Sequence, residues 1–234
     1  MEFPLRKIKS FVRRGGRQSL SQSRALTELW PQYGLDCAES PIDLNTVFEN
    51  PAPIVLEIGF GNGVHLLNMA IANPDKNYIG IEVYRSGIGS LLVATDKAQI
   101  KNLKVFCADA VDVLQHCIPD HSLSKVYILF PDPWPKLRHH KRRLIQKDFV
   151  DLLSKKLAHG GHCHCATDWQ NYAEQMMEVF SAHTAFKNAY GSHQYAPSEV
   201  RSIETKFEQR GQRLGHSIWD LVFESVLLTS AFLI

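Results

Sequence analysis

The feature that most constrains this chain is an alternation of short apolar runs with longer amphipathic segments between residues 54 and 181. The apolar runs are rich in β-branched and aliphatic residues, and each precedes a turn and a stretch with helical periodicity. Strands that alternate with helices form a parallel sheet with helices on both faces. The sequence therefore predicts an α/β fold built on a doubly wound, mainly parallel, seven-stranded sheet of the Rossmann-like kind.

Five parallel strands are expected, at residues 54–58, 78–83, 103–107, 125–130 and 161–167. The intervening helices are expected at 64–72, 85–98, 110–117, 143–158 and 169–181. Two later strands, near 184–190 and 217–228, should pair antiparallel across a long loop. We expect residues 31–234 to form one domain. Residues 1–30 are basic and Ser-rich and lack a sustained apolar period, so a flexible arm is expected there.

An acidic residue follows or ends each of the five parallel strands. These residues are Glu57, Glu82, Asp109, Asp132 and Asp168. In such sheets ligands bind beyond the carboxyl ends of the strands. One acid at that edge would be unremarkable, but five predict a binding site lined by carboxylates.

A glycine turn, Gly59-Phe60-Gly61-Asn62-Gly63, joins the first of these strands to its helix. A dinucleotide fingerprint would need glycine where Val64 stands, and a Walker-type lysine is missing. Glu82 can accept hydrogen bonds from two ribose hydroxyls, and Asp109 is placed for an adenine amino group. The arrangement is similar to that of class I methyltransferases that use S-adenosylmethionine, although a tight turn without a ligand would also explain the glycines.

The loop Phe130–Lys136 contains three prolines, so it must leave the sheet as a stiff, extended segment. It presents Asp132 and Trp134 and runs into a basic stretch that ends at Lys147. Two short stretches, 6–24 and 136–147, hold half of the 26 Lys and Arg residues, although the formal net charge is only +2. Such patches suit phosphate binding, a solvated surface being the alternative. The expected phosphate contacts are Arg13, Arg14, Arg138, Lys141, Arg142 and Arg143.

Several classes of protein are disfavoured. The five cysteines are odd in number and contain no Cys-x-x-Cys pair, which favours a reducing cytoplasm over a disulfide framework. Strand alternation places the histidines and cysteines of His162–Cys165 on opposite faces, so no metal site is expected. No apolar run approaches the roughly 20 residues that span a bilayer, so no membrane association is expected. Nothing predicts an obligate protein partner, and both a monomer and a homodimer stay open.

From about residue 10 to 224 the chain resembles the tRNA (guanine-N7-)-methyltransferase family, bacterial TrmB type. The resemblance is carried by Ser10–Arg14, Leu56–Gly63, Gly80–Val83, Asp109–Val111, Phe130–Trp134, Lys136, Lys141–Arg143, Thr167–Trp169, Thr205–Gly211 and Leu214–Leu221. It implies methyl transfer from S-adenosylmethionine to N7 of a variable-loop guanosine, guanosine 46, of tRNA. Two departures are Pro135, where the family often has a polar residue, and an uncertain register between Arg201 and Thr205.

The resemblance also implies residue roles. Cofactor binding is implied for Glu57, Gly59, Gly61, Gly63, Glu82, Asp109 and Asp132. Substrate binding is implied for Lys136, Asp168, Thr205, Lys206, Phe207 and Glu208.

Guanine N7 carries a lone pair and no proton, so its methylation needs no general base, while the base becomes cationic. We therefore expect Asp132 to act catalytically by orienting the purine and stabilising positive charge, with proton removal the less favoured role. Trp134 either stacks on a splayed base or packs the loop, and Glu57 either contacts the cofactor or caps the glycine turn. The competing functions are a class I methyltransferase for another RNA, a protein or a small molecule, and a non-catalytic RNA-binding module.

Overall fold

In the computed structural model, which describes residues 8–12, 17–36, 40–201 and 217–226, the strands form one sheet in the order β1-β4-β3-β2-β5-β6-β8-β7. Six strands are parallel: β1 (Gly34–Leu35), β2 (Ile54–Ile58), β3 (Asn77–Ile81), β4 (Leu103–Phe106), β5 (Leu123–Leu129) and β6 (Leu157–Thr167). Two are antiparallel: β7 (Phe186–Asn188) and β8 (Trp219–Ser225). The expected parallel sheet with an antiparallel C-terminal pair is confirmed.

Strand β2 lies at the centre of the sheet, between β3 and β5. From β2 the chain builds outward through β3 and β4, and then crosses back to add β5 and β6 on the other side. The connections therefore reverse direction between β2 and β5, and this switch point leaves a crevice beyond the carboxyl ends of both strands.

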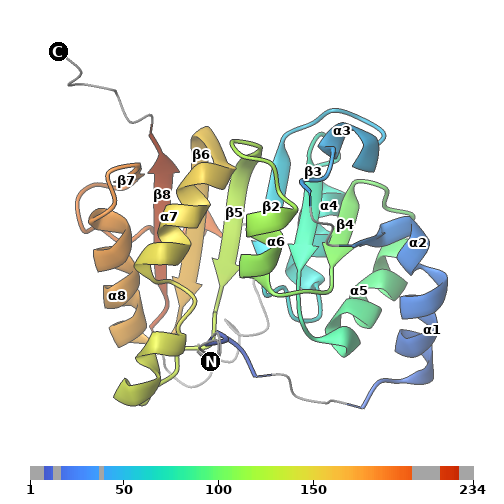
Figure 1. The fold of residues 1–234 in the computed structure, drawn as a ribbon, viewed down its shortest axis with the longest axis horizontal. Helices are drawn as coiled ribbons and strands as arrows, with labels where there is room; N and C mark the ends of the chain where they lie inside the picture. The colour runs from blue at the N-terminus through green and yellow to red at the C-terminus, as the bar shows by residue number, and fades with distance from the viewer. Residues whose placement is uncertain (1–7, 13–16, 37–39, 202–216, 227–234) are drawn as a thin grey trace, which may run out of the picture.

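Helices cover both faces of the sheet (Figure 1). Helices α6 (Ala110–His116), α7 (Lys147–Lys156) and α8 (Gln170–Ser181) pack through Val113, Leu153 and Phe180 on one face. Helices α1 (Leu20–Glu28), α4 (Val64–Ala72) and α5 (Arg85–Lys97) pack through Leu26, Leu66 and Leu91 on the other. The short helices are α2 (Trp30–Tyr33), α3 (Leu44–Val47) and the 3₁₀ helices η1 (Leu137–Arg142) and η2 (Ser198–Val200).

The expected flexible arm through residue 30 is wrong for residues 20–28, which form α1. Ser19 caps this helix in a capping box with Gln22, and the helix buries Ala25 and Leu26. The sequence offered little warning because two buried side chains in a polar segment do not establish a helical period. The two-residue strand β1 was also missed, because so short a strand has no alternation to detect.

Cys107, Cys163 and Cys165 are free thiols. Cys163 and Cys165 lie on the buried face of β6 with their sulfurs 3.7 Å apart, and burial raises the pKa of the Cys163 thiol.

Candidate active site

A cleft of about 890 Å³ lies beyond the carboxyl ends of β2 to β5, at the switch point of the sheet. Four of the five predicted acids line it: Glu57, Glu82, Asp109 and Asp132. Asp168, which follows β6, is not among the described residues that line this cleft. The topology thus brings together residues that are up to 75 positions apart in the chain, because successive parallel strands end at one edge.

Glu82 fastens the glycine turn to the end of β3. Its Oε2 accepts a hydrogen bond from the backbone N–H of Gly61 at 2.9 Å, and its Oε1 accepts from Val83 and Tyr84 at 2.7 and 3.0 Å. Burial raises the pKa of Glu82, and these three backbone donors oppose the rise. Because each carboxylate oxygen has two lone pairs, Glu82 retains acceptor capacity toward the cleft.

The glycine turn requires glycines for conformation and for space. Gly61 and Gly63 have φ of 60° and 76°, in the left-handed region that side chains disfavour. A Cβ on Gly63 would lie within 2.8 Å of Leu91, whereas a Cβ on Gly59 or Gly61 would meet nothing within 4 Å. Open space above Gly59 and Gly61 beside the acidic rim fits the nucleoside of S-adenosylmethionine, which has no phosphate to neutralise.

Gly87, in the first turn of α5, is a site residue that the sequence interpretation missed. It lines the cleft, and a Cβ there would overlap the carbonyl oxygen of Gly61. Helix α5 and the glycine turn are therefore in direct backbone contact. A glycine inside a helical pattern is the signal that could have identified this close approach.

We expect Gly87→Ala to weaken cofactor binding about tenfold, because the new methyl group must push the Gly61 carbonyl out of place. Isothermal titration of S-adenosylhomocysteine into the purified variant measures this effect. Val93→Ala, at an exposed position of the same helix, is the control and should bind normally. Unchanged affinity in Gly87→Ala would show that the contact between turn and helix is unimportant.

Glu57 pairs with a residue that the pattern did not single out. Its Oε2 lies 2.8 Å from Nδ1 of His65, and both side chains are buried. His65 also meets the ring of Tyr127 edge to face, with centroids 5.2 Å apart. Glu57 therefore faces the cleft while being held by α4, and its described hydrogen bond goes to His65 and not to the glycine turn. A polar residue on the apolar face of α4 was the available signal.

The loop after β5 is held in an unusual backbone conformation. Phe130 and Trp134 have φ of 53° and 45°, which costs non-glycine residues on the order of 1–3 kcal/mol each. The N–H of Phe130 donates to the carbonyl of Ala166 at 2.7 Å, which fixes the start of the loop. Asp132 lies between the two strained residues, exposed and lining the cleft. Strain of this kind concentrates where geometry serves function.

Trp134 packs against its own chain. Its indole N–H donates to the carbonyl of Ser10 at 2.9 Å, and the guanidinium of Arg142 lies 3.9 Å from the ring centroid. Of the two roles considered for Trp134, these contacts favour packing of the loop over stacking on a base.

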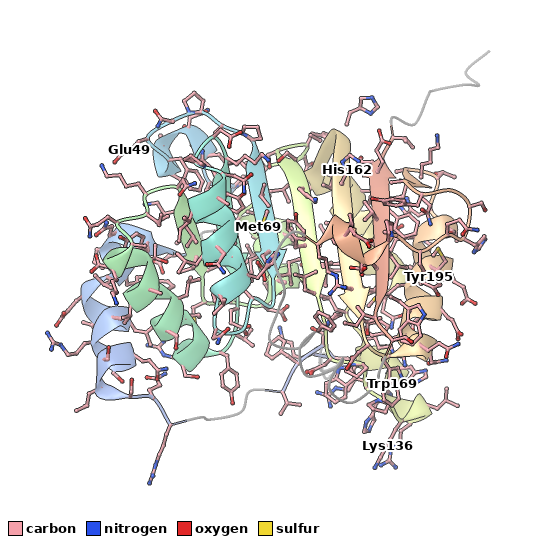
Figure 2. All side chains as sticks on the ribbon, turned by 180° about the vertical axis from the view of Figure 1, so that it is seen from behind. Glu49, Met69, Lys136, His162, Trp169 and Tyr195 are labelled. Carbon is pink, nitrogen blue, oxygen red and sulfur yellow. The ribbon has the colours of Figure 1, made fainter. Side chains whose placement is uncertain are left out.

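The basic stretch after this loop divides into exposed and buried cations. Lys136, Arg138 and Lys141 are exposed on or beside η1. Figure 2 shows Lys136 pointing outward at the same end of the molecule as Trp169, which follows β6. The exposed part of this stretch therefore borders the end of the sheet that carries the cleft.

Arg143 requires a correction, because it is only 2% exposed and is not available to phosphate. Its guanidinium donates to the carbonyl of Pro133 at 2.8 Å, to Oε1 of Gln175 at 2.6 Å and to Oδ1 of Asn171 at 2.9 Å. Arg143 thus ties the loop after β5 to α8. Arg143 lies directly after η1, and the charge run alone does not disclose that the chain turns into the core at this residue.

Some predicted site residues lie outside the described residues, namely Arg13, Arg14, Thr205, Lys206, Phe207 and Glu208. Within the described ranges, no group of three or more His, Cys, Asp or Glu side chains is placed to hold a metal ion. Those same ranges contain no helix long and apolar enough to cross a membrane.

Comparison with known proteins identifies the family. Residues 51–221 match the family model described as "Putative methyltransferase". The tRNA (guanine-N(7)-)-methyltransferase of Aeromonas hydrophila is 52% identical over 222 residues, covering 95% of this chain and 94% of that protein. The enzyme of the same name from Salmonella typhimurium is 50% identical over 223 residues, covering 95% and 93%.

Among solved structures, the 16S rRNA methyltransferase KamB superposes with a TM-score of 0.60 at 17% identity, covering 83% of this chain and 98% of that one. That likeness shows the methyltransferase fold alone. The sequence identity to the two relatives and the matching family model go further: the chain belongs to the tRNA (guanine-N7-)-methyltransferase family.

Proposed function

We propose that the protein transfers a methyl group from S-adenosylmethionine to N7 of a guanosine in tRNA. The observation that carries this proposal is the adjacency of two features: a cleft lined by four carboxylates and an open glycine turn, and the exposed cations Lys136, Arg138 and Lys141 on the segment that follows Asp132. A small-molecule or protein methyltransferase would leave the concentration of cations beside the cleft unexplained. A non-catalytic RNA-binding module has no use for the cleft.

The cofactor supplies an electrophilic methyl group on a sulfonium, and this chain's residues hold it. We assign Asp109 to the adenine amino group, Glu82 to the ribose hydroxyls and Glu57 to the amino-acid end. The backbone of Gly59, Gly61 and Gly63 gives the nucleoside its close approach. Much of the acceleration comes from holding the methyl group in line with N7 of the bound guanine, because the reaction between two bound reactants is effectively unimolecular.

On the guanine side, Asp132 accepts hydrogen bonds from the purine edge and stabilises the charge that the base acquires. Asp168 shares the purine edge or the ribose, and Lys136 holds the RNA backbone. The segment Thr205 to Glu208 is proposed to complete this pocket. We further propose guanosine 46 of the variable loop as the target and the cytoplasm as the place of action. The proposed catalytic unit is the domain at residues 31–234 together with α1, which packs into the same core, and it needs no obligate protein partner.

The test is incubation of the full chain with S-adenosylmethionine carrying a labelled methyl group and unmodified tRNA, followed by nucleoside analysis. Label in 7-methylguanosine is the expected result. Label in any other nucleoside overturns the substrate assignment, and label in protein would favour the competing methyltransferase function.

Binding of tRNA should weaken steeply with salt, because neutralised phosphates release counterions. Replacing Lys136, Arg138 and Lys141 together by Gln should reduce the slope of log K against log salt by about 0.7–0.9 for each phosphate that is no longer neutralised. Filter binding between 50 and 300 mM KCl measures this slope. The matched control replaces Lys97 and Lys187, exposed cations on α5 and β7, by Gln and should keep the wild-type slope. If tRNA binding by the wild type did not depend on salt, the cations of the basic stretch would not contact phosphates.

A further inference from the structure

Residues 9–12 border the cleft, and we call this segment the strap. Ser10, Phe11 and Val12 line the cleft. Three consecutive strap carbonyls accept hydrogen bonds from the segment that follows β5: Arg142 donates to those of Lys9 and Phe11 at 3.3 and 3.4 Å, and Trp134 donates to that of Ser10 at 2.9 Å. Figure 1 shows this part of the chain passing along the edge where the parallel strands end.

The side chain of Lys9 ends on an acid at the cofactor cleft. Its Nζ donates to Oδ2 of Asp109 at 2.5 Å and lies 3.3 Å from Oδ2 of Asp112. The hydrogen bond to Asp109 is the largest cause of the raised pKa of Lys9, so the ammonium stays charged at neutral pH. Asp109 is 8% exposed, whereas Lys9 and Asp112 are each about 40% exposed.

The two carboxylate oxygens of Asp109 accept different hydrogen bonds. Its Oδ1 caps α6 by accepting the N–H of Val111 at 3.1 Å, so that oxygen is committed to the fold. Its Oδ2 is the oxygen left for a donor in the cleft, and Lys9 supplies one. An adenine amino group can donate a hydrogen bond to the same oxygen. Because the amino group is neutral, it does not replace the charge interaction that is lost when Lys9 leaves Asp109.

We propose that Lys9 is an internal competitor for the adenine amino group at Asp109, and that cofactor binding moves the ammonium onto Asp112. Asp112 is already within reach, so the strap keeps one acidic partner and stays over the cleft. The strap is thus part of the cofactor site. This inference rests on the cofactor assignment in the proposed function and is independent of the tRNA substrate.

The size of the effect follows from the exposure of the pair. An ion pair with one largely exposed partner is weak, so its displacement costs the cofactor a modest factor in affinity. Lys9→Met removes the ammonium and keeps an apolar side chain of similar length. The hydrogen bonds from Arg142 and Trp134 to the strap carbonyls are retained. We expect Lys9→Met to bind S-adenosylhomocysteine about two- to fivefold more tightly than the wild type.

The experiment is isothermal titration of the full chain, without tRNA, with two probes. One probe is S-adenosylhomocysteine, and the other is S-inosylhomocysteine, in which a carbonyl oxygen replaces the amino group. Tighter binding of the first probe by Lys9→Met, and no gain with the second, is the expected result. Lys187→Met, at an exposed position of β7, should match the wild type. The gain should shrink as salt rises toward about 0.5 M, because screening weakens the ion pair in the wild type.

Unchanged or weaker binding of S-adenosylhomocysteine by Lys9→Met would overturn the competition, as would an equal gain with both probes. Circular dichroism checks that the variant is folded, and Asp109→Asn should abolish the difference between lysine and methionine at position 9. Wild-type protein that binds neither probe would refute the cofactor assignment itself. A protein that binds and methylates normally, yet shows no effect of Lys9→Met, would refute only this inference.

Discussion

Asp132→Asn should lower kcat for tRNA methylation by about 100- to 1,000-fold, the range seen when one group aimed at developing charge is removed. Asparagine keeps the size of the side chain and one acceptor oxygen, but it loses the negative charge. That charge matters because guanine becomes cationic as its N7 is methylated. The affinity for the cofactor should change little, since Glu57, Glu82 and Asp109 remain in the cleft.

Single-turnover measurement of labelled methyl transfer separates this effect from product release. Asp148→Asn, at an exposed position of α7, is the control and should react normally. The rate should show no solvent deuterium isotope effect, because no proton leaves N7; a clear isotope effect would favour the general-base role. Near-normal turnover in Asp132→Asn would contradict charge stabilisation.

Asp220→Ala should lower the free energy of unfolding by about 3–5 kcal/mol, the usual cost of breaking a buried ion pair by removing one of its members. Asp220 is 2% exposed, and its Oδ1 lies 2.9 Å from both Nε of Arg201 and Nε2 of His164. Burial lowers the pKa of His164, so this histidine is neutral at pH 7 and Arg201 carries the opposing charge. Removal of Asp220 would take away the buried carboxylate that balances this cation.

Urea unfolding at pH 7, followed by circular dichroism, measures the loss. Asp148→Ala provides the exposed comparison and should leave the midpoint nearly unchanged. The pair Asp220→Leu and Arg201→Met, made together, should recover much of the stability, because an apolar pair needs no compensation. A loss below about 1 kcal/mol in Asp220→Ala would mean that solvent or another group already satisfies Arg201.

The sequence predicted those parts of the fold that depend on local pattern. Helix 64–72 matches α4 in both bounds, because Gly63 precedes it and Asn73-Pro74 stops it. Placement of Glu57, Glu82, Asp109 and Asp132 in one cleft needed only the order of strands and the rule that parallel strands end together. Both inferences depend only on interactions within one helix or one strand–helix unit.

The remaining features depend on contacts between distant residues. Lys9 meets Asp109 across 100 positions, and Trp134 meets Ser10 across 124. No local period encodes such pairs. Arg143 was assigned to RNA because its neighbours are basic, but the packing of α8 against the loop after β5 decided its burial. Lys141, within η1, is exposed, whereas Arg143, just after η1, is buried, and the run of charges does not distinguish them.

The buried pair of Asp220 and Arg201 also has a meaning for protein engineering. One residue immediately precedes the segment 202–216 and the other follows it within β8, and the N–H of Ala196 donates to the Asp220 carbonyl at 2.8 Å. The described residues on the two sides of this segment are therefore held to each other. Residues 202–216 can be treated as a cassette: exchange with a relative's segment, with Arg201 and Asp220 retained, should transplant substrate preference without rebuilding the sheet.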